Sequence, residues 1–523
     1  MNQKQTKKKV NDVFIISLVL VAAIAAWGIF SPETMGQAGN FIFSLLTAKF
    51  GWLYMIVMFL FVVFMLYLAF SKYGSIRLGK DADRPEHKNI SWFSMLFSAG
   101  MGIGLVFWGV AEPLNHYLFP DASLGLAGGT AEAADFGVFA SFFHWGLHPW
   151  ANYCVIALPL AYMQFRKDKP GLISSIFIPL LGEKRVNGPI GKAIDILAIF
   201  ATVAGVATSL GLGVLQINSG LNYIFGVPTT LLVQMIIIIV LTIVFVGTAV
   251  AGIDKGISKL SDLNVAICGV LMVIVLAIGP TVMILDSFTN GMGQYISGLI
   301  SESLRVSTFG DNSWIEAWRI FYWAWWIAWA PFVGMFIARI SKGRTVREFV
   351  IGVTVVPALG SCLWFAIFGS TSISFGAELA EKAIAVTENA YFIIMEQLPL
   401  GTILSVVTIV LLCTFFTTSA NSATFVLGML ASRGNLNPST GMKIVWGLLQ
   451  SLIALALMLA GGLNMLQTIS IVAAFPFAFV MVAGCISFMK ALKSEKALKS
   501  EKLADRIKGK KSGDTEIQSK PIS

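Results

Sequence analysis

The chain has 523 residues, of which 56% are hydrophobic and only 12% are charged. Its mean hydropathy of +0.78 excludes a soluble globular protein and predicts a polytopic membrane protein. The formal net charge is +9. We interpret this excess as a signal of membrane orientation and not as a nucleic-acid-binding surface, because the basic residues lie in loops and tails between apolar segments.

Twelve segments are long and apolar enough to cross a bilayer, which takes about 20 residues of helix. They predict an all-α fold of twelve transmembrane helices without a soluble catalytic domain. The polar segment 1–12 comes first, and no small-residue cleavage site follows it, so we expect a tail and an anchor and not a signal peptide. The predicted spans lie near 13–30, 50–71, 91–113, 134–165, 191–224, 229–250, 263–285, 314–340, 347–372, 400–431, 441–461 and 465–490.

Lysine and arginine residues are distributed unevenly between alternate loops. Loop 71–90 holds five of them and loop 166–192 holds six, whereas the loops of the other side hold only Lys49, Arg305 and Lys382. Since cytoplasmic loops are enriched in Lys and Arg, both termini are predicted to be cytoplasmic at the cell membrane. The predicted organisation is therefore a cytoplasmic tail, a twelve-helix transport domain and a basic cytoplasmic tail, at 1–12, 13–490 and 491–523.

The C-terminal segment 491–523 contains the sequence ALKSEK twice, at 491–496 and 497–502. Glu495 and Lys499 are four residues apart and form a favourable pair on a helix. Two interpretations stay open. The segment is either a solvated tail or a helix that touches anionic lipid headgroups and senses osmotic stress.

The first interruption of the apolar pattern is SAGMGIG, Ser98 to Gly104, in the middle of the third span. Gly100, Gly102 and Gly104 lower the conformational free energy of an unwound backbone in the middle of the span. Glycines in membrane helices also serve close helix packing. Three alternating glycines favour an unwound segment that lines a polar cavity, as in many transporters.

The second interruption is FFTTSANSATF, Phe415 to Phe425, in the tenth span. Thr and Ser hydroxyls in a helix often bond back to a carbonyl one turn earlier, which explains one or two of these residues. A run of several uncharged oxygen donors also suits a hard alkali cation such as sodium.

The third interruption is aromatic, the sequence FYWAWWIAW at 321–329. Tyr322, Trp325, Trp326 and Trp329 fall within about 100° on one face of a helix. They lie in the middle of their span, which disfavours a membrane-interface belt. The fourth span repeats the pattern in HWGLHPWANY, around a Pro149 that we expect to interrupt the helix. Two such clusters on separate helices can enclose a quaternary ammonium by cation–π attraction.

Ionisable residues are scarce near the centres of the predicted spans. Only His148 falls there, and the remaining candidates lie towards span ends. Proton-coupled carriers usually contain buried Asp, Glu or His, so a neutral, aromatic and oxygen-lined centre favours a zwitterion that moves with sodium. The residues towards span ends are Glu112, Asp195, Asp262 and Arg319.

Three stretches, GMGIGLVFWGVAEP, HWGLHPWANY and YWAWWIAWAPFVGMFIARISKGRT, together resemble the betaine/carnitine/choline transporter family. The resemblance extends over essentially all twelve spans and is closest to the sodium-coupled glycine betaine transporters. It implies an inverted repeat of the LeuT type, in which spans 3–7 and 8–12 follow two extra helices. It also implies alternating access and a homotrimer.

The resemblance further implies which residues bind the substrate and the coupling ion. No cofactor other than sodium is implied. The substrate residues that match are Trp145, Trp150, Tyr153, Trp325, Trp326, Trp329, Gly100, Gly102 and Gly104, and the sodium ligands that match are Ser98, Met101, Phe415, Thr418 and Ser419. A second sodium site of the family uses two threonines one turn apart, where this chain has Thr202 and Val206, so the number of ions stays open.

The sequence therefore predicts a secondary active importer of glycine betaine by sodium symport, for osmoprotection. Gly104 favours glycine betaine, because some choline or carnitine carriers resemble this motif with Asp there. A carnitine or choline transporter, or a sodium-independent exchanger of the same family, is the alternative. An ion channel is disfavoured by aromatic residues at the midplane, and an enzyme by the lack of a nucleophile–base pair or metal-ligand spacing.

Overall fold

The computed structural model describes residues 11–100, 102–252 and 254–517, with side chains described outside 98–100, 254–258 and 496–517. Every regular element in these ranges is helical, apart from one isolated antiparallel bridge between Arg77 and Thr345. Nine of the described helices are long and apolar enough to cross a membrane. The all-α, polytopic prediction is confirmed, whereas the count of twelve spans and the inverted repeat stay predictions.

The first part of the chain builds the first two long helices and then two pairs of shorter ones. The helices are α1 (Asp12–Phe30), α2 (Pro32–Phe70), α3 (Asn89–Gly100), α4 (Ile103–Leu118), α5 (Ala131–Trp145) and α6 (Leu147–Ala161). The short helices between and after them are η1 (Ala122–Leu124), η2 (Tyr162–Arg166), η3 (Ile173–Phe177), α7 (Ile178–Leu181) and α8 (Glu183–Val186).

The middle and last parts alternate long helices with short external or connecting ones. The long helices are α9 (Pro189–Phe225), α10 (Leu231–Ala251), α11 (Asp254–Ile278), α12 (Thr281–Ser303), α13 (Phe321–Arg339), α14 (Val346–Ile373), α17 (Gly401–Ala431) and α18 (Thr440–Ile517). The short ones are η4 (Ile315–Ile320), α15 (Ala377–Ile384), η5 (Thr387–Asn389) and α16 (Ala390–Glu396).

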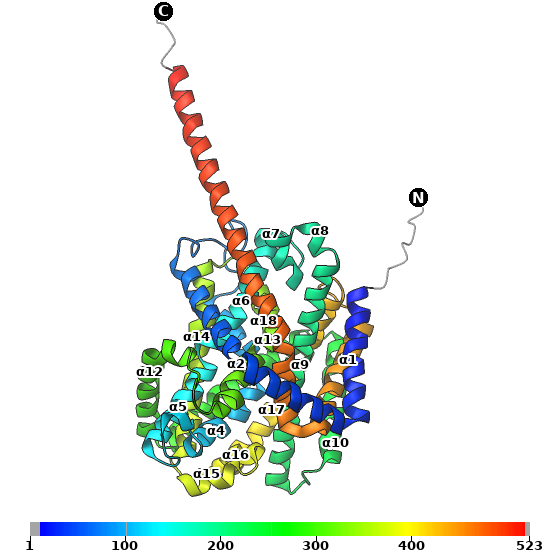
Figure 1. Ribbon diagram of the computed structural model, residues 1–523, viewed down its shortest axis with the longest axis vertical. Coiled ribbons are helices and arrows are strands. Elements are labelled where there is room, and N and C mark those ends of the chain that lie inside the picture. Colours follow the sequence, from blue (N-terminus) through cyan, green and yellow to red (C-terminus); the bar gives the residue numbers. More distant parts are fainter. Residues whose placement is uncertain (1–10, 101, 253, 518–523) are drawn as a thin grey trace, which may run out of the picture.

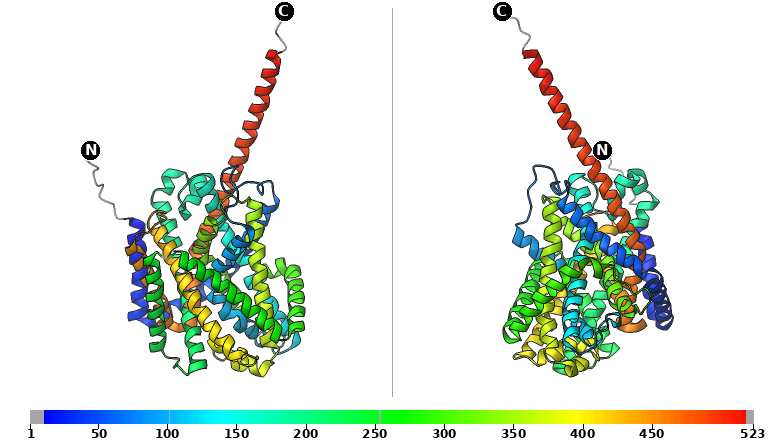
Figure 2. Two further views of the ribbon diagram at one scale, coloured as in Figure 1. Left: turned by 180° about the vertical axis from the view of Figure 1, so that it is seen from behind. Right: turned by 60° about the vertical axis from the view of Figure 1, so that its left-hand side comes forward.

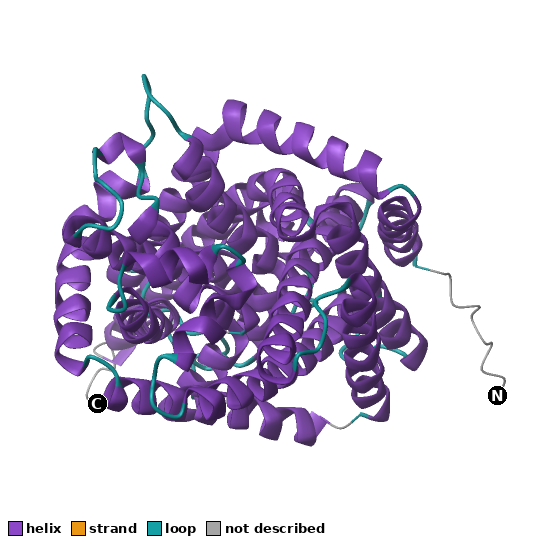
Figure 3. Cartoon of the chain, turned by 90° about the horizontal axis from the view of Figure 1, so that it is seen from below, coloured by secondary structure: helices purple, strands orange, loops and turns teal. Residues whose placement is uncertain are grey.

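The helices differ in how much of their surface they bury, and this places α13 at the centre. In the most apolar stretch of α1 and of α10, 28% of the residues are buried, as expected for helices that face lipid. In Ile315–Arg339, which comprises η4 and α13, 94% are buried. Figure 3 shows the bundle from one end, with an outer ring of helices around others in the interior. The aromatic segment FYWAWWIAW therefore occupies the core of the molecule and not its lipid-facing surface.

Several predicted spans are interrupted at glycines. The third predicted span divides into α3 and α4 around Gly102, which has φ −156° and ψ −143°. The neighbouring Met101 lies outside the described residues. The fourth divides into α5 and α6 at Gly146. The last two predicted spans both lie on α18, which is interrupted at Gly461 and Gly462, where φ is 167° and 57°. Only Gly462 has a left-handed φ, a conformation that glycine adopts without steric cost.

The loops that were predicted to be cytoplasmic lie together at one end of the bundle. Leu78 N donates to Arg344 O at 2.8 Å, and Lys80 pairs with Asp168 at 2.5 Å. Asn11, before α1, donates through Nδ2 to the carbonyl oxygen of Ala431 at 2.5 Å. In Figure 1 this end carries α7, α8, the start of α1 and the projecting end of α18.

The C-terminal part of α18 leaves the bundle as a continuous helix (Figure 2). Its last described side chain, Glu495, accepts hydrogen bonds from Arg166 Nη2 at 2.6 Å and from Lys167 Nζ at 2.6 Å. Arg166 also donates to the carbonyl oxygen of Gly79 at 2.7 Å. This cluster fixes the root of the C-terminal helix to two of the basic loops, and the segment is helical through Ile517. Its contact with lipid and its response to osmotic stress stay predictions.

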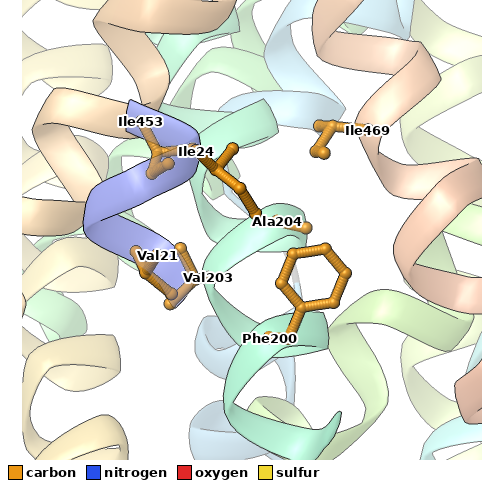
Figure 4. A pocket seen from close by; sticks show the side chains of 7 residues that line it. All are labelled: Val21, Ile24, Phe200, Val203, Ala204, Ile453 and Ile469. Atoms are coloured by element: carbon orange, nitrogen blue, oxygen red, sulfur yellow. The ribbon is translucent and has the colours of Figure 1, made fainter. Parts of the chain in front are cut away.

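One small cavity lies between α1, α9 and α18 (Figure 4). All of its lining side chains are apolar, and none of them is a predicted site residue. A cavity without polar groups does not suit a zwitterion or an ion. The lining residues are Val21, Ile24, Phe200, Val203, Ala204, Ile453 and Ile469.

Candidate functional site

The break between α5 and α6 gives the candidate site its shape. Gly146 has φ −86° and ψ −123°, and a Cβ there would lie 2.5 Å from the hydroxyl oxygen of Tyr295. The backbone N–H of Leu147 donates to that hydroxyl at 2.7 Å. Pro149 lies in the first turn of α6, where the missing N–H removes no helical hydrogen bond. The helix is therefore interrupted just before Pro149, as expected, because this proline cannot bond to the carbonyl of Trp145, and Gly146 is the residue that leaves the helical conformation.

The same break releases a carbonyl group for an indole. Trp326 on α13 donates through Nε1 to the carbonyl oxygen of His144 at 3.0 Å. In return, Asn152 on α6 donates through Nδ2 to the carbonyl oxygen of Trp326 at 2.6 Å. Two reciprocal hydrogen bonds thus hold α13 against α5 and α6 at the level of the aromatic residues.

Four buried aromatic side chains from these helices meet, and we call Trp145, Tyr153, Trp325 and Trp326 the aromatic box. The Trp145 and Trp326 rings are 4.8 Å apart between centroids, in edge-to-face contact. Trp325 stacks on Trp326 at 5.0 Å, and Tyr153 lies 6.4 Å from Trp326. No ring is more than 3% exposed, so the indoles face the interior and not lipid. In this conformation the two walls contact each other directly.

The other two predicted aromatic residues stand at the margin of the box. Trp150 contacts Tyr153 edge to face at 5.6 Å. Trp329 lies 6.3 Å from Trp325, and its Nε1 donates to the carbonyl oxygen of Gly205 on α9 at 2.7 Å. The structure therefore brings all six predicted aromatic residues into one region, with Trp150 and Trp329 one contact removed from its centre.

The glycine motif lies against the box from the α4 side. A Cβ on Gly104 would stand 2.5 Å from Trp325 Cη2 and 3.1 Å from Trp145 Cη2, so glycine is required where both rings approach. A Cβ on Gly102 would be 3.6 Å from Ser419 Oγ, which is ordinary contact. Gly100 ends α3, and its surroundings lie outside the described side chains.

The predicted sodium ligands come from two places, of which the structure describes one. Thr418 is buried in α17, and its Oγ1 donates back to the carbonyl oxygens of Thr414 at 3.0 Å and Phe415 at 3.2 Å. Ser419 lies beside the unwound segment, opposite Gly102. The side chain of Ser98 and the whole of Met101 fall outside the described part of the chain. The complete ligand set is therefore a prediction.

The position of the predicted second ion lies on α9, close to Trp329. Thr202 and Val206 are both buried, and Thr202 Oγ1 has no hydrogen-bond partner among the described residues. Gly205, between them in sequence, would place a Cβ 2.5 Å from Trp329 Cδ1. One unsatisfied hydroxyl is thus available here, beside an apolar side chain where the family pattern has a second hydroxyl.

Sequence reasoning missed a buried ionisable cluster behind the box. Glu112, His116 and His144 are all fully buried, and Glu112 Oε1 lies 2.7 Å from His144 Nδ1 and 3.4 Å from His116 Nε2. The expectation of a centre that is free of charged groups is therefore wrong. The spacing of Glu112 and His116, four apart on one helix face, was the available signal.

The remaining buried ionisable groups near this region have partners. Arg319 is fully buried and pairs with Glu302 at 3.1 Å, while its guanidinium lies 4.7 Å from the Phe143 ring. His148 is hydrogen-bonded to Ser303 Oγ at 2.8 Å and stacks on Trp323. These contacts satisfy Nε2 of the His148 ring, whereas Nδ1 has no hydrogen-bond partner among the described residues.

Comparison with known proteins places this geometry in a family. The model of the betaine/carnitine/choline family of transporters matches residues 12–497. The glycine betaine transporter OpuD of Bacillus subtilis is 48% identical over 501 residues, which cover 95% of this chain and 97% of that protein.

Two further relatives are equally complete in coverage. A probable glycine betaine transporter of Desulfitobacterium hafniense is 44% identical over 93% of this chain and 98% of its own length. An ectoine/hydroxyectoine transporter of Virgibacillus pantothenticus is 44% identical over 94% of this chain and 98% of its own length. These matches confirm a transporter and not an enzyme. The chain belongs to the betaine/carnitine/choline family of transporters.

Proposed function

We propose that this transporter imports glycine betaine with sodium, by alternating access, and serves osmoprotection. The observation that carries the proposal is the aromatic box, in which walls from α5–α6 and α13 face each other in the core. Desolvated cation–π attraction to a quaternary ammonium amounts to about 2 kcal/mol or more per contact. The relatives named as glycine betaine transporters support the same substrate.

Substrate entry requires the walls to separate. Trp145 and Trp326 are in ring contact here, so a trimethylammonium group is accommodated only after one wall rotates. The interruptions at Gly102 and Gly146 are suitable hinges, because both lie directly beside the box. Trp150, Trp329, Gly100 and the other motif glycines complete the proposed substrate site.

The buried hydroxyl of Tyr153 is a further candidate contact for the substrate. It has no hydrogen-bond partner among the described residues, although its ring is in the box. A phenol O–H donates well to a carboxylate. A zwitterion with its ammonium between the indoles places its carboxylate within reach of such donors.

We assign the coupling sodium to Ser98, Met101, Phe415, Thr418 and Ser419. The closeness of Gly102 and Ser419, where an added Cβ would lie 3.6 Å from Oγ, supports this assignment, because it sets an α17 hydroxyl beside unwound backbone. Hydroxyl and carbonyl oxygens are suitable ligands for a hard cation. A second ion at Thr202 lacks the partner hydroxyl at Val206, so we propose one ion as the essential one.

The same proposal includes the membrane setting. The common end of the basic loops is proposed to be cytoplasmic in the cell membrane. The helical end of α18 is proposed to touch anionic lipid and to respond to osmotic stress, and the functional unit is proposed to be a homotrimer. The cluster of Glu495 with Arg166 and Lys167 gives such a helix a direct connection to the loops.

A second candidate substrate is ectoine or hydroxyectoine, which the Virgibacillus relative is named for. Its cation is delocalised and carries no trimethylammonium group. Carnitine and choline remain the alternatives within the family. Gly104 disfavours choline, because a carboxylate side chain at that position would balance the net charge of choline, and a Cβ there would displace Trp325.

The protein in lipid vesicles should take up radiolabelled glycine betaine, and an inward sodium gradient should drive the uptake. Unlabelled betaine should compete better than ectoine, carnitine or choline. Uptake that is the same without sodium would contradict symport and favour exchange. Stronger competition by ectoine would transfer the substrate assignment to the second candidate.

Trp326→Leu should weaken betaine affinity by roughly tenfold or more, because the central ring of the box is lost. Competition binding in vesicles measures the change. Trp52→Leu is the matched control, since Trp52 is 53% exposed on α2, far in sequence from the site. Equal affinity in the Trp326 variant and the control would count against the cage.

The double substitution Thr418→Ala with Ser419→Ala should raise the sodium concentration for half-maximal uptake by roughly tenfold, because two oxygen ligands are removed. The control is Thr414→Ala with Thr417→Ala on the same helix, whose hydroxyls bond back to α17 carbonyls. A sodium dependence that is equal in both double variants would show that the ion binds elsewhere.

Gly104→Ala should reduce betaine affinity by about tenfold, because the added methyl would force Trp325 and Trp145 to shift, an overpacking cost of about 1–3 kcal/mol. Gly247→Ala, on α10, is the control, since a Cβ there meets nothing within 4 Å. Binding isotherms of both variants provide the measurement. Unaltered affinity in the Gly104 variant would mean that the ring positions do not matter to the ligand.

A further inference from the structure

Glu112, on α4, is the point at which both walls of the box are connected. Its Oε2 accepts a hydrogen bond from Trp145 Nε1 at 2.8 Å and another from the hydroxyl of Tyr322. Trp145 ends α5, and Tyr322 is in the first turn of α13. The Tyr322 ring is 5.6 Å from Trp145 and 5.8 Å from Trp326, so it packs against one ring of each wall. One carboxylate oxygen therefore positions side chains from two helices.

The other oxygen of this carboxylate faces two histidines. His144 Nδ1 is 2.7 Å from Oε1, and His116 Nε2 is 3.4 Å from it. Trp314 donates through Nε1 to His116 Nδ1 at 3.3 Å, which leaves the His116 proton on Nε2, towards the carboxylate. An ionised carboxylate only accepts hydrogen bonds, and every one of these neighbours is able to donate.

Trp145 and Tyr322 are neutral donors, so they stabilise the carboxylate without cancelling its charge. The buried cation Arg319, whose guanidinium lies 5.3 Å from the Trp314 ring, is held by the carboxylate and the backbone oxygen of Glu302. Burying an unpaired charge is costly even when it is hydrogen-bonded. The indole of Trp145 connects this carboxylate to the proposed ammonium site. The positive charge of the substrate is therefore the group that balances the charge of Glu112.

We propose that Glu112 is a positioning residue for the aromatic box and the electrostatic partner of the bound cation. This proposal rests on the proposed function, because it takes the box to be the cation site. A carboxylate hydrogen-bonded to an indole N–H raises the electron density of the ring, which strengthens cation–π attraction. Its charge also attracts the cation directly through a medium of low dielectric constant.

Hydrogen bonding accounts for the cluster better than a metal ion does. Glu112, His116 and His144 carry ligand atoms within 4.8 Å of one another and are the kind of set that binds transition metals. Ligand atoms around a tetrahedral ion at about 2.0–2.1 Å are separated by roughly 3.3 Å. The 2.7 Å separation of His144 Nδ1 and Glu112 Oε1 is that of a donor and an acceptor.

The test compares two ligands of the same shape and different charge. Glycine betaine has a trimethylammonium group, and 3,3-dimethylbutanoate replaces its nitrogen with carbon and keeps the carboxylate. Binding of both is measured on the full-length wild type in vesicles, and on Glu112→Gln, Glu112→Asp and the control Asp195→Asn. Asp195 is also a buried carboxylate, but it accepts hydrogen bonds from Ser174.

The Glu112→Gln variant should weaken the binding of glycine betaine about tenfold more than that of the carbon isostere. Both ligands carry the same carboxylate, and only the ammonium group of betaine is attracted by the charge that is lost. Glu112→Asp should give a smaller difference, about threefold, because the shorter carboxylate retreats from Trp145. The ratio of the two affinities should be unchanged in the Asp195 control. Disturbed packing alone would weaken both ligands equally.

The outcomes distinguish failure of the proposed role of Glu112 from failure of the proposed function. An equal loss for cation and isostere in the Gln variant would overturn the role of Glu112 while leaving the proposed function intact. If the Gln variant does not reach the membrane, a wild-type affinity ratio in the Asp variant would overturn that role as well. If the wild type binds neither betaine nor any other trimethylammonium compound, the proposed function itself is wrong and this role is rejected with it.

Discussion

Three indole N–H groups in and beside the aromatic box find an acceptor inside the protein, and these bonds determine how their rings are oriented. Trp145 donates to Glu112, Trp326 to the freed carbonyl of His144, and Trp329 to the carbonyl of Gly205. At membrane depth an unsatisfied N–H costs several kcal/mol, so each indole edge is held in place. The ring faces are then the surfaces that remain for a cation.

Glycines make this arrangement possible in two different ways. Gly146 breaks a helix and thereby releases the carbonyl group that orients Trp326. Gly104 and Gly205 remain packed and supply room, because a Cβ at either would lie 2.5 Å from an indole carbon. The proposed substrate site and the helix interruption consequently involve the same few residues, as in transporters whose binding sites are formed by discontinuous helices.

Two buried ionisable side chains in the interior have different kinds of partner. Arg319 is paired with Glu302, so its burial is compensated within the protein. Glu112 accepts hydrogen bonds from the neutral side chains of Trp145 and Tyr322, and its charge beside the box is the basis of our proposal. In our proposal the aromatic cage and the nearby carboxylate are complementary. The cage selects a ligand by the shape of its ammonium group, and the carboxylate selects a positive charge.

The sequence by itself determined that the chain is a helical membrane protein, that its basic loops share one end, and that two aromatic clusters belong to one site. These are consequences of hydropathy and of helical spacing, which are local properties. Tertiary structure decided that the carbonyl group freed at the break between α5 and α6 orients Trp326, and that Glu112 is hydrogen-bonded to a residue of each wall. The partners of Glu112 are 33 and 210 residues away in sequence, and no local pattern encodes a hydrogen bond over such separations.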